Sequence, residues 1–391
     1  MSILFFPRYC AALALCALLM PLPVLAAPLY TVIFLPGANF GPTAMNNAGQ
    51  IAGFVNTSDG NSRAVVYSGG VLQDLGAPRG SFSYANAINE TGAIAGTVVI
   101  DGVAHGFRYQ DGNLLDFGAN TSGSGINARG DVVGGISTDT GTFGYVYSNG
   151  IVTQLPNLGT GRQGFAADIN DNGTIAGSST TDLVSSPPPY HPYLYQGGDL
   201  RDLGDLDGRE VNMATAINNA GQIAGYSESR TDAHAFLYDN GVLQDLGGFG
   251  GTAVSVNDLN ENGILVGTAF ASPRGLIPFI NDGAALVDLN TLVDPASGWL
   301  LLEAYANNDL GQIIGFGCQG DTCAVVRLDL AVPVPEPTEA SLMAFGLALI
   351  LGYLLVCRQR KATAVRQPIA CTLTARWTKA GHPKTSVHGG G

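Results

Sequence analysis

The sequence predicts an all-β fold made of seven four-stranded repeats, each of about 44 residues. Three observations support this prediction. A ten-residue phrase returns seven times, tight two-residue turns recur between its copies, and the strand that the last repeat lacks has a counterpart at the start of the chain. Apolar residues alternate with polar ones throughout, which is typical of half-buried strands and not of a disordered chain.

The repeated phrase has the form A-I-N-x-x-G-x-I-A-G. Asn and Gly tolerate the positive φ that a tight turn requires, so each copy predicts a strand, a turn and a second strand. The copies span residues 44–53, 87–96, 125–134, 168–177, 216–225, 258–267 and 306–315. Their asparagines are Asn46, Asn89, Asn127, Asn170, Asn218, Asn260 and Asn308.

The fifth copy best displays the order of elements within one repeat. One strand ends at Ile217, a second covers residues 222–227, a third covers 234–238, and a fourth covers 242–246. Asp239-Asn240-Gly241 forms the turn between the last two strands. Equivalent turns are expected at Gly69-Gly70, Asp111-Gly112, Asn149-Gly150, Gly197-Gly198 and Asp282-Gly283.

Four antiparallel strands in a repeat of this length match the blade of a β-propeller, so residues 27–332 are predicted to form a seven-bladed propeller. The seventh copy has its third strand at residues 324–328 and then enters Pro333 without a fourth. Residues 30–37 look like a fourth strand, so we expect this N-terminal strand to close the last blade and remove an open edge. An open β-solenoid is the alternative, but it does not explain the complementary ends.

The two ends of the chain carry export signals. Arg8 is the only charge before an apolar run at residues 9–20, and small residues follow it, which predicts a secretory signal peptide over residues 1–26. A second uncharged run, residues 341–357, is long enough for a transmembrane helix. The basic cluster after it predicts that its C-terminal side stays in the cytoplasm. The basic, patternless tail over residues 362–391 is expected to be disordered.

The residues around this second run form a tripartite segment, 333–361. Val334-Pro335-Glu336-Pro337 precedes the apolar helix, and Arg358, Arg360 and Lys361 follow it. This order resembles the PEP-CTERM sorting signal of Gram-negative bacteria. The resemblance implies a segment held in the inner membrane and cut by an exosortase, with the protein then released or moved to the cell surface. The chain departs from the family pattern by continuing for 30 residues after Lys361.

The repeated phrases carry a second resemblance. A-I-N-x-x-G-x-I-A-G and H-A-F-L-Y, the latter with His234-Ala235-Phe236, resemble the HAF-repeat family of bacterial extracellular proteins over residues 30–330. This resemblance implies export and a surface role. It implies no substrate, because that family has no established activity or catalytic residues to carry over.

The composition of the exported region limits its partners and its redox state. Residues 27–332 hold 29 Asp and Glu against 10 Arg and no Lys, so nucleic acid is not an expected partner. Cys318 and Cys323 are the cysteines of this region, and in an oxidising compartment they are expected to form a disulfide. A redox or metal site would require two residues between the cysteines or a nearby histidine, and neither is present.

The conspicuous polar residues repeat, which indicates a scaffold more than a catalytic site. His105, His191 and His234 occupy one place in their repeats, where we expect a structural hydrogen bond. The recurring D-L aspartates are expected to brace turns; they are Asp74, Asp116, Asp202, Asp245 and Asp288. Asp205, Asp207 and Glu210 have the acid spacing of part of a calcium loop, but an acidic surface turn is the favoured interpretation. We therefore expect no metal, no cofactor and no enzymatic activity.

The remaining connections vary in length and should lie opposite the tight turns. They include residues 178–190, 204–214, 268–277 and 289–304, and the variable set contains the aromatic residues Tyr190, Phe249, Phe270 and Trp299. Variable loops on a rigid scaffold commonly house recognition, so this face is expected to bind an extracellular glycan or matrix component. The other interpretation is that these aromatics cover blade edges. A polysaccharide hydrolase or lyase is the alternative function, and it would need convergent acids at the central channel.

Overall fold

The computed structural model describes residues 30–331 apart from residues 38, 59, 77–79, 207, 282 and 284. The chain divides into two compact units, Met1–Val332 and Pro333–Gly391, and the described residues belong to the first. The expected signal peptide, sorting segment and tail lie outside the described residues, together with Val334, Pro335, Glu336, Pro337, Arg358, Arg360 and Lys361. Among the described residues, no helix is both long and apolar enough to cross a bilayer.

The described chain is all-β and of the propeller type. Its strands form five four-stranded sheets and one eight-stranded sheet. The first sheet contains β2 (Gly41–Met45), β3 (Ile51–Asn56), β4 (Ser62–Ser68) and β5 (Val71–Asp74). The second contains β6 (Gly80–Ile88), β7 (Ile94–Ile100), β8 (Val103–Gln110) and β9 (Asn113–Ala119). The third contains β10 (Thr121–Ile126), β11 (Val132–Thr138), β12 (Gly141–Ser148) and β13 (Ile151–Gln154).

The eight-stranded sheet consists of two four-strand halves that meet at one parallel pair, Tyr190 with Val211. Its first half contains β14 (Gly164–Ile169), β15 (Ile175–Thr180), β16 (Tyr190–Gln196) and β17 (Asp199–Asp202). Its second half contains β18 (Val211–Ile217), β19 (Ile223–Glu228), β20 (Ala233–Asp239) and β21 (Val242–Gly247).

Two further sheets complete the described region. The first contains β22 (Ala253–Leu259), β23 (Leu265–Ala271), β24 (Gly275–Asn281) and β25 (Leu286–Asp288). The short 3-10 helices η1 (Leu289–Thr291) and η2 (Pro295–Ser297) follow it. The second sheet contains β26 (Trp299–Asn307), β27 (Ile313–Gln319), β28 (Thr322–Leu330) and the N-terminal β1 (Tyr30–Phe34).

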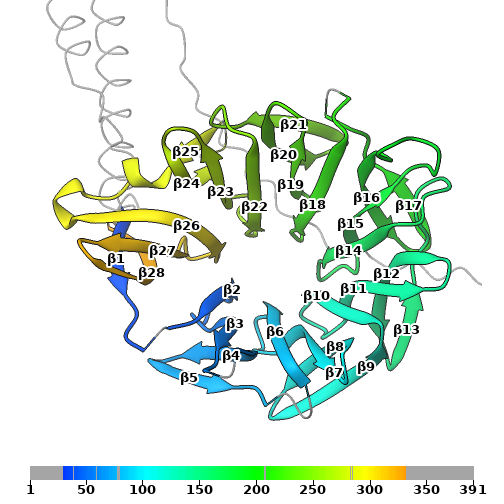
Figure 1. The fold of residues 1–391 in the computed structure, drawn as a ribbon, viewed down its shortest axis with the longest axis horizontal. Coiled ribbons are helices and arrows are strands. Elements are labelled where there is room, and N and C mark those ends of the chain that lie inside the picture. Colours follow the sequence, from blue (N-terminus) through cyan, green and yellow to red (C-terminus); the bar gives the residue numbers. More distant parts are fainter. Residues whose placement is uncertain are drawn as a thin grey trace, which may run out of the picture. The chain divides into compact units, whose positions relative to one another are not determined.

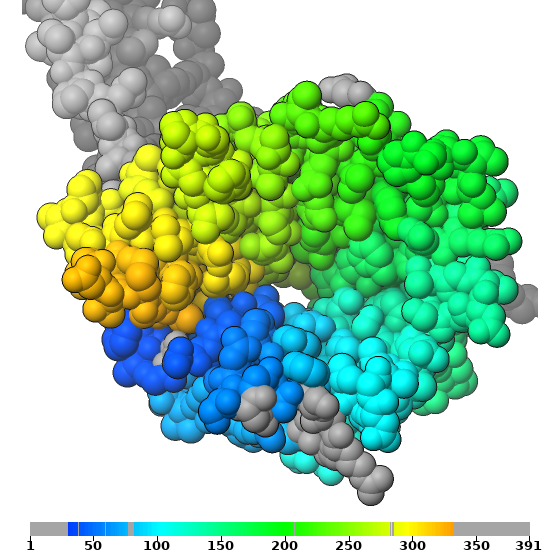
Figure 2. Space-filling model, in the orientation of Figure 1, coloured from blue at the N-terminus to red at the C-terminus, as the bar shows by residue number. Residues whose placement is uncertain are grey.

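The sheets are arranged in a ring, with the first strand of each four-strand group at the centre (Figure 1). The strands β2, β6, β10, β14, β18, β22 and β26 contact one another in this order, and β26 contacts β2. The order is therefore closed, as in a ring and unlike a stacked coil. Figure 2 shows an opening at the centre, between these innermost strands.

The N-terminal strand completes the last sheet. β1 runs antiparallel to β28, from the pair Tyr30 with Leu330 to the pair Phe34 with Val326, and in Figure 1 the blue strand lies beside the orange one. The backbone N–H of Tyr30 also donates to the carbonyl oxygen of Leu292, at 2.7 Å. The expected pairing of the two ends is confirmed, and β28 extends beyond the predicted residues 324–328 at both ends.

Each innermost strand carries a β-bulge three residues before its repeated asparagine. Two residues before the bulged residue, a backbone carbonyl lies against the glycine that ends the phrase in the next strand. A Cβ added at Gly96 would overlap the carbonyl oxygen of Tyr84 and lie 2.6 Å from the ring of Phe107. A side chain at this position is therefore excluded, which explains why the phrase ends in glycine every time.

Apolar side chains fill the space between neighbouring sheets. Ala52 and Val66 of the first sheet pack with Ile94 and Phe107 of the second, for example. Aromatic residues at one third-strand position are fully buried; they are Phe107, Tyr145, Tyr193, Phe236 and Phe279. The phenylalanine of the H-A-F triplet is thus a core residue, and its recurrence reflects packing.

The variable connections are shorter than the sequence predicts, because strands extend into them. β23 continues to Ala271 and β24 begins at Gly275, so most of the predicted loop 268–277 is strand. Likewise, β26 begins at Trp299, inside the predicted loop 289–304. The strands extend because Ala269, Ala271 and Ile277 are buried in a core cluster. The remaining variable connections cover residues 181–189, 203–210, 272–274 and 289–298.

Cys318 and Cys323 form a disulfide between β27 and β28. The two residues are direct partners in the antiparallel register, with Cα atoms 4.0 Å apart. The disulfide therefore clamps the hairpin whose outer strand receives β1.

Candidate functional site

The repeated asparagines form a closed ring of hydrogen bonds at one end of the innermost strands. The side-chain Nδ2 of each donates to the backbone oxygen of the asparagine in the next repeat, at 2.8–3.3 Å. The last bond runs from Asn308 to Asn46, across 262 residues of sequence. All seven side chains are buried. This asparagine ring, Asn46, Asn89, Asn127, Asn170, Asn218, Asn260 and Asn308, links each repeat to the next and the last to the first.

The oxygen of the same side chain holds the local turn. In the fourth repeat, Oδ1 of Asn170 accepts from the backbone N–H groups of Asn172 (3.1 Å) and Thr174 (2.9 Å). An amide side chain can donate on one side and accept on the other, whereas a carboxylate can only accept. The position therefore requires asparagine for a structural reason.

The residue after each asparagine adds an outer tier of bonds between repeats. In six cases its side chain accepts the backbone N–H of the equivalent residue in the preceding repeat, at 2.7–3.1 Å. The tier is interrupted at Ala128, because the alanine side chain cannot accept the N–H of Glu90. Four of the accepting side chains are carboxylates, from Glu90, Asp171, Glu261 and Asp309. Among the described residues, no three His, Cys, Asp or Glu side chains are placed to hold a metal ion.

Two aspartates bridge neighbouring innermost strands just before the asparagine ring. Asp168 of β14 accepts backbone N–H bonds from Ile169 and, at 3.0 Å, from Ile217 of β18. Asp258 of β22 likewise accepts from Leu259 and, at 2.9 Å, from Asn307 of β26. Burial raises the pKa of Asp168 to about 6 and that of Asp258 to about 7, although the N–H bonds act in the opposite direction.

These two pKa values predict that the protein loses stability as the pH rises from 5 to 8. The folded state retains protons that the unfolded state has already released above pH 4, so the stabilisation is lost as the pH passes through 6 and 7. Each unit of pKa shift corresponds to about 1.4 kcal/mol. We expect the unfolding midpoint in urea to fall across this range, and Asp258→Asn to make the dependence shallower. Asp199 is exposed, so Asp199→Asn serves as the control and should leave the pH dependence of the midpoint unchanged. A wild-type midpoint that stays constant or rises across this range would contradict the prediction.

The three repeated histidines form pairs with the D-L aspartates. Nδ1 of His105, His191 and His234 lies 2.9–3.0 Å from a carboxylate oxygen of Asp116, Asp202 and Asp245, respectively. Each of these aspartates also accepts the N–H of the glycine two residues later, and so does Asp74. Asp288 accepts from Asn290 in the same way. The expected structural roles of the histidines and aspartates are confirmed.

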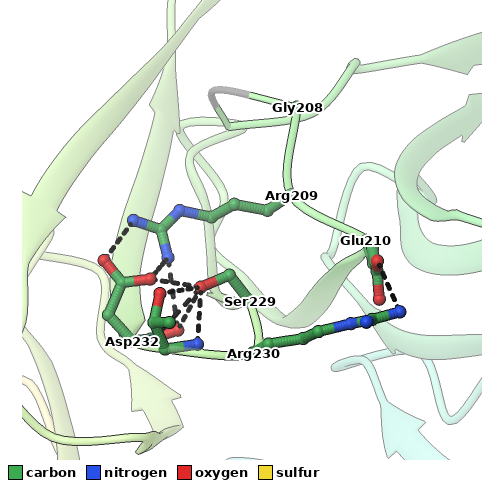
Figure 3. A pocket seen from close by; sticks show the side chains of 7 residues that line it. Gly208, Arg209, Glu210, Ser229, Arg230 and Asp232 are labelled. Carbon is green, nitrogen blue, oxygen red and sulfur yellow. Dashed lines mark hydrogen bonds and ion pairs between the residues drawn. The ribbon is translucent and has the colours of Figure 1, made fainter.

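A polar cavity lies on the opposite face, between the β17–β18 and β19–β20 connections (Figure 3). Its volume is about 400 Å³, which is within the range of small-molecule sites. Gly208, Arg209 and Glu210 contribute one side, and residues 229–232 contribute the other. This polar cavity is built partly from one of the predicted variable connections.

One wall of the polar cavity is a fixed ion pair. The two terminal nitrogens of Arg209 lie 2.8 and 3.0 Å from the two carboxylate oxygens of Asp232, a bidentate arrangement. Only 10% of the Arg209 side chain is exposed. Hydrogen bonds from Arg209, and then from Ser229, lower the pKa of Asp232 to about 2. Asp232 is therefore a permanent acceptor at physiological pH.

The other wall is adjustable. Arg230 lies 3.6 Å from Glu210, and their side chains are 80% and 46% exposed. Such a pair is weakly held, because solvent screens it and both side chains lose entropy in forming it. Its groups can therefore reorient toward a ligand at little energetic cost.

The four predicted aromatics do not line the polar cavity. Tyr190 begins β16 and donates its hydroxyl to Gln163, at 2.6 Å. Phe249 packs against the core, with its ring 6.0 Å from that of Phe279, and Trp299 packs on another core cluster. Phe270 is 47% exposed. Their role as ligand contacts stays a prediction.

The acidic turn predicted from the sequence lies beside the cavity, and the structure describes part of it. Asp205 accepts the N–H of Gly208 at 2.6 Å and lies 3.8 Å from Nε2 of His191. Asp207 lies outside the described residues. Glu210 pairs with Arg230, so it serves the polar cavity.

Sequence reasoning missed the Arg209–Asp232 pair, because the two residues lie on different connections and occur once. A signal was present at Asp232. It stands two residues before His234, where the other histidine-bearing repeats have Val103 and Pro189. A charged departure from the repeat pattern marks the cavity.

Comparison with known proteins yields similarity of fold only. No family model matches the chain, and no curated protein matches it. Similar solved structures include the β-propeller domain of the Trilobed protease from Pyrococcus furiosus, at 14% identity and TM-score 0.49, covering 64% of this chain and 81% of that one. An acylaminoacyl peptidase from Pyrococcus horikoshii matches at 11% identity and TM-score 0.49, over 71% of this chain and 50% of that one. TolB from Acinetobacter baumannii matches at 13% identity and TM-score 0.44, over 62% of each chain. At these values the likeness assigns neither a family nor an activity.

Proposed function

We propose that this protein is an exported, seven-bladed β-propeller that serves as a non-catalytic binding or structural component of the bacterial surface or extracellular matrix. In this proposal each half of the eight-stranded sheet is one blade. The C-terminal segment is processed by an exosortase after transient anchoring in the inner membrane. The face opposite the asparagine ring binds an extracellular polar ligand, with glycan as the favoured class.

The observation that carries this proposal is the use made of the repeated polar residues. Asparagines, aspartates and histidines recur from repeat to repeat, and their polar atoms bond to neighbouring strands or turns. They hold the ring together, as expected of a scaffold. The Arg209–Asp232 cluster occurs once and lines a cavity on the face with the variable connections, where recognition is usually housed.

Sorting can be tested in a bacterium that carries an exosortase. The full chain with an internal epitope tag in the exposed turn at residues 149–150 is expected to appear as a shortened, surface-exposed form. Deleting the exosortase gene, or changing Pro335 and Glu336 to alanine, should leave a longer form in the inner membrane. A matched change outside the motif, Thr338→Ala, should be processed normally. A chain that retains its C-terminus in wild-type cells would refute the sorting proposal.

The alternative function is a polysaccharide hydrolase or lyase, which would need a general acid with a raised pKa near the central channel. Asp168 and Asp258 on the innermost strands have raised pKa values and are the residues to test, although both are buried and accept two backbone N–H bonds each. Reducing-end release from neutral and acidic polysaccharides should therefore be assayed with the wild type and with Asp258→Asn. Turnover by the wild type that is lost in the variant would establish the enzyme and overturn the non-catalytic proposal.

A further inference from the structure

The polar cavity combines hydrogen-bond donors and acceptors in charge-balanced pairs. Arg209 faces Asp232, and Arg230 faces Glu210, so the formal charges of its four ionised side chains cancel. Ser229 and Thr231 add two hydroxyl groups to the same lining. Among the described residues that line the cavity, none is aromatic or large and aliphatic. An apolar ligand would therefore bury its surface against polar groups and gain little.

One acceptor of this cavity, Asp232, is held in place before any ligand arrives. Asp232 is fixed by Arg209, and its backbone oxygen accepts from the N–H of Ser229 at 2.9 Å. The Ser229 hydroxyl bonds to the Asp232 carboxylate and also accepts the N–H of Thr231 at 3.2 Å. The 229–232 turn is thus cross-linked within itself. A preorganised acceptor lowers the entropic cost of binding.

The balance of charge determines which polar ligand suits the site. A sugar with neighbouring hydroxyls can accept from a guanidinium and donate to a carboxylate at once, because each hydroxyl does both. An anionic sugar would meet Glu210 and Asp232 locally. It would also meet the repulsion of a region with 29 acidic residues against 10 arginines.

We propose that the polar cavity binds a neutral saccharide through neighbouring hydroxyl groups. This inference rests on the proposed role of this face in glycan binding. Asp232 accepts a hydrogen bond from one hydroxyl of the sugar. Arg230 donates a hydrogen bond to an adjacent hydroxyl, and Glu210 accepts one from it. Arg209 is a positioning residue, because its terminal nitrogens hold Asp232 and its side chain is almost wholly buried.

The test is titration calorimetry of residues 27–332 with cellotetraose, laminaritetraose, mannotetraose and, as the anionic counterpart, tetragalacturonate. At least one neutral tetrasaccharide is expected to bind, and more tightly than tetragalacturonate. Arg230→Ala and Glu210→Gln should each weaken that binding about fivefold or more, since each removes a hydrogen bond to a charged group. Both side chains are exposed, so the variants should fold. Arg63→Ala is the control, because Arg63 also forms a surface ion pair, with Asp74 at 3.4 Å in the first sheet, where the two side chains are 45% and 47% exposed.

Three outcomes would overturn this inference. Tighter binding of tetragalacturonate would show that charge and not hydroxyl geometry selects the ligand. Unchanged affinity in both Arg230→Ala and Glu210→Gln would place the saccharide elsewhere on the protein, and the proposed surface role would then survive without this site. If none of the four saccharides binds, the inference fails, and the sorting experiment still decides the proposed export on its own.

Discussion

Removal of β1 is expected to open the ring and cost most of the stability of the protein. A chain that begins at Leu35 loses the whole β1–β28 pairing and the buried side chain of Tyr30. Truncating one large buried aromatic alone costs about 3–5 kcal/mol, which is a large share of a typical folding free energy of about 5–15 kcal/mol. We expect a sharply lowered thermal midpoint and self-association in light scattering, because the edge of β28 becomes free to pair with another chain.

A peptide supplies the control for this truncation. A synthetic peptide of residues 30–36, added in excess, should pair with the free edge of β28 and raise the midpoint, whereas a scrambled peptide should not. If the truncated chain melts within about 2 °C of residues 27–332, β1 does not close the ring in solution.

Replacing one member of the asparagine ring should have the next largest effect. In Asn170→Ala, the N–H groups of Asn172 and Thr174 lose their acceptor. The backbone oxygen of Asn218 loses one of its two donors, at 3.0 Å in the native protein, and keeps the N–H of Gly221. Each buried polar group left unpaired costs about 1–3 kcal/mol. We expect a loss of about 3–5 kcal/mol in the free energy of unfolding, measured by urea denaturation.

Two further variants sharpen this test. Asn170→Asp keeps the acceptor oxygen but cannot donate to Asn218, so it should also be destabilising. Asn113→Ala removes an exposed amide that bonds only within its own hairpin, to Asp111, and should change stability by less than about 0.5 kcal/mol. Similar losses of stability in Asn113→Ala and Asn170→Ala would mean that the asparagine ring contributes no more to stability than an exposed side-chain hydrogen bond.

Much of the fold could be predicted from local patterns. The turn at Asn218 to Gly221 and the hairpin turn at Asn240-Gly241 depend on residues that tolerate unusual backbone angles, and Asn240 and Gly241 do have positive φ. The closing strand could be predicted because Tyr30 to Phe34 supplies the one element that the last copy lacks. The ends of the variable connections were placed wrongly, since burial in the core extends a strand such as β23 past the point where its local pattern weakens.

The candidate site was predictable only in part. The face with the variable connections could be assigned from the alternation of short and long turns. The packing of the aromatics predicted to lie there could not be read from the sequence, because Phe249 and Trp299 are partly buried against two different core clusters. The cavity residues Arg209 and Asp232 carry no local pattern, and their pairing depends on how two connections 23 residues apart come together.

The sequence by itself determined the number of repeats, the positions of their tight turns and the strand that completes the last sheet, because these follow from the conformational preferences of neighbouring residues. Only the tertiary structure explains why the same phrase occurs in every repeat. Its asparagines bond across 38 to 48 residues, and finally across 262, while its last glycine leaves room for a backbone carbonyl of the innermost strand. Such contacts exist only once the ring has closed, so no stretch of the sequence specifies them locally.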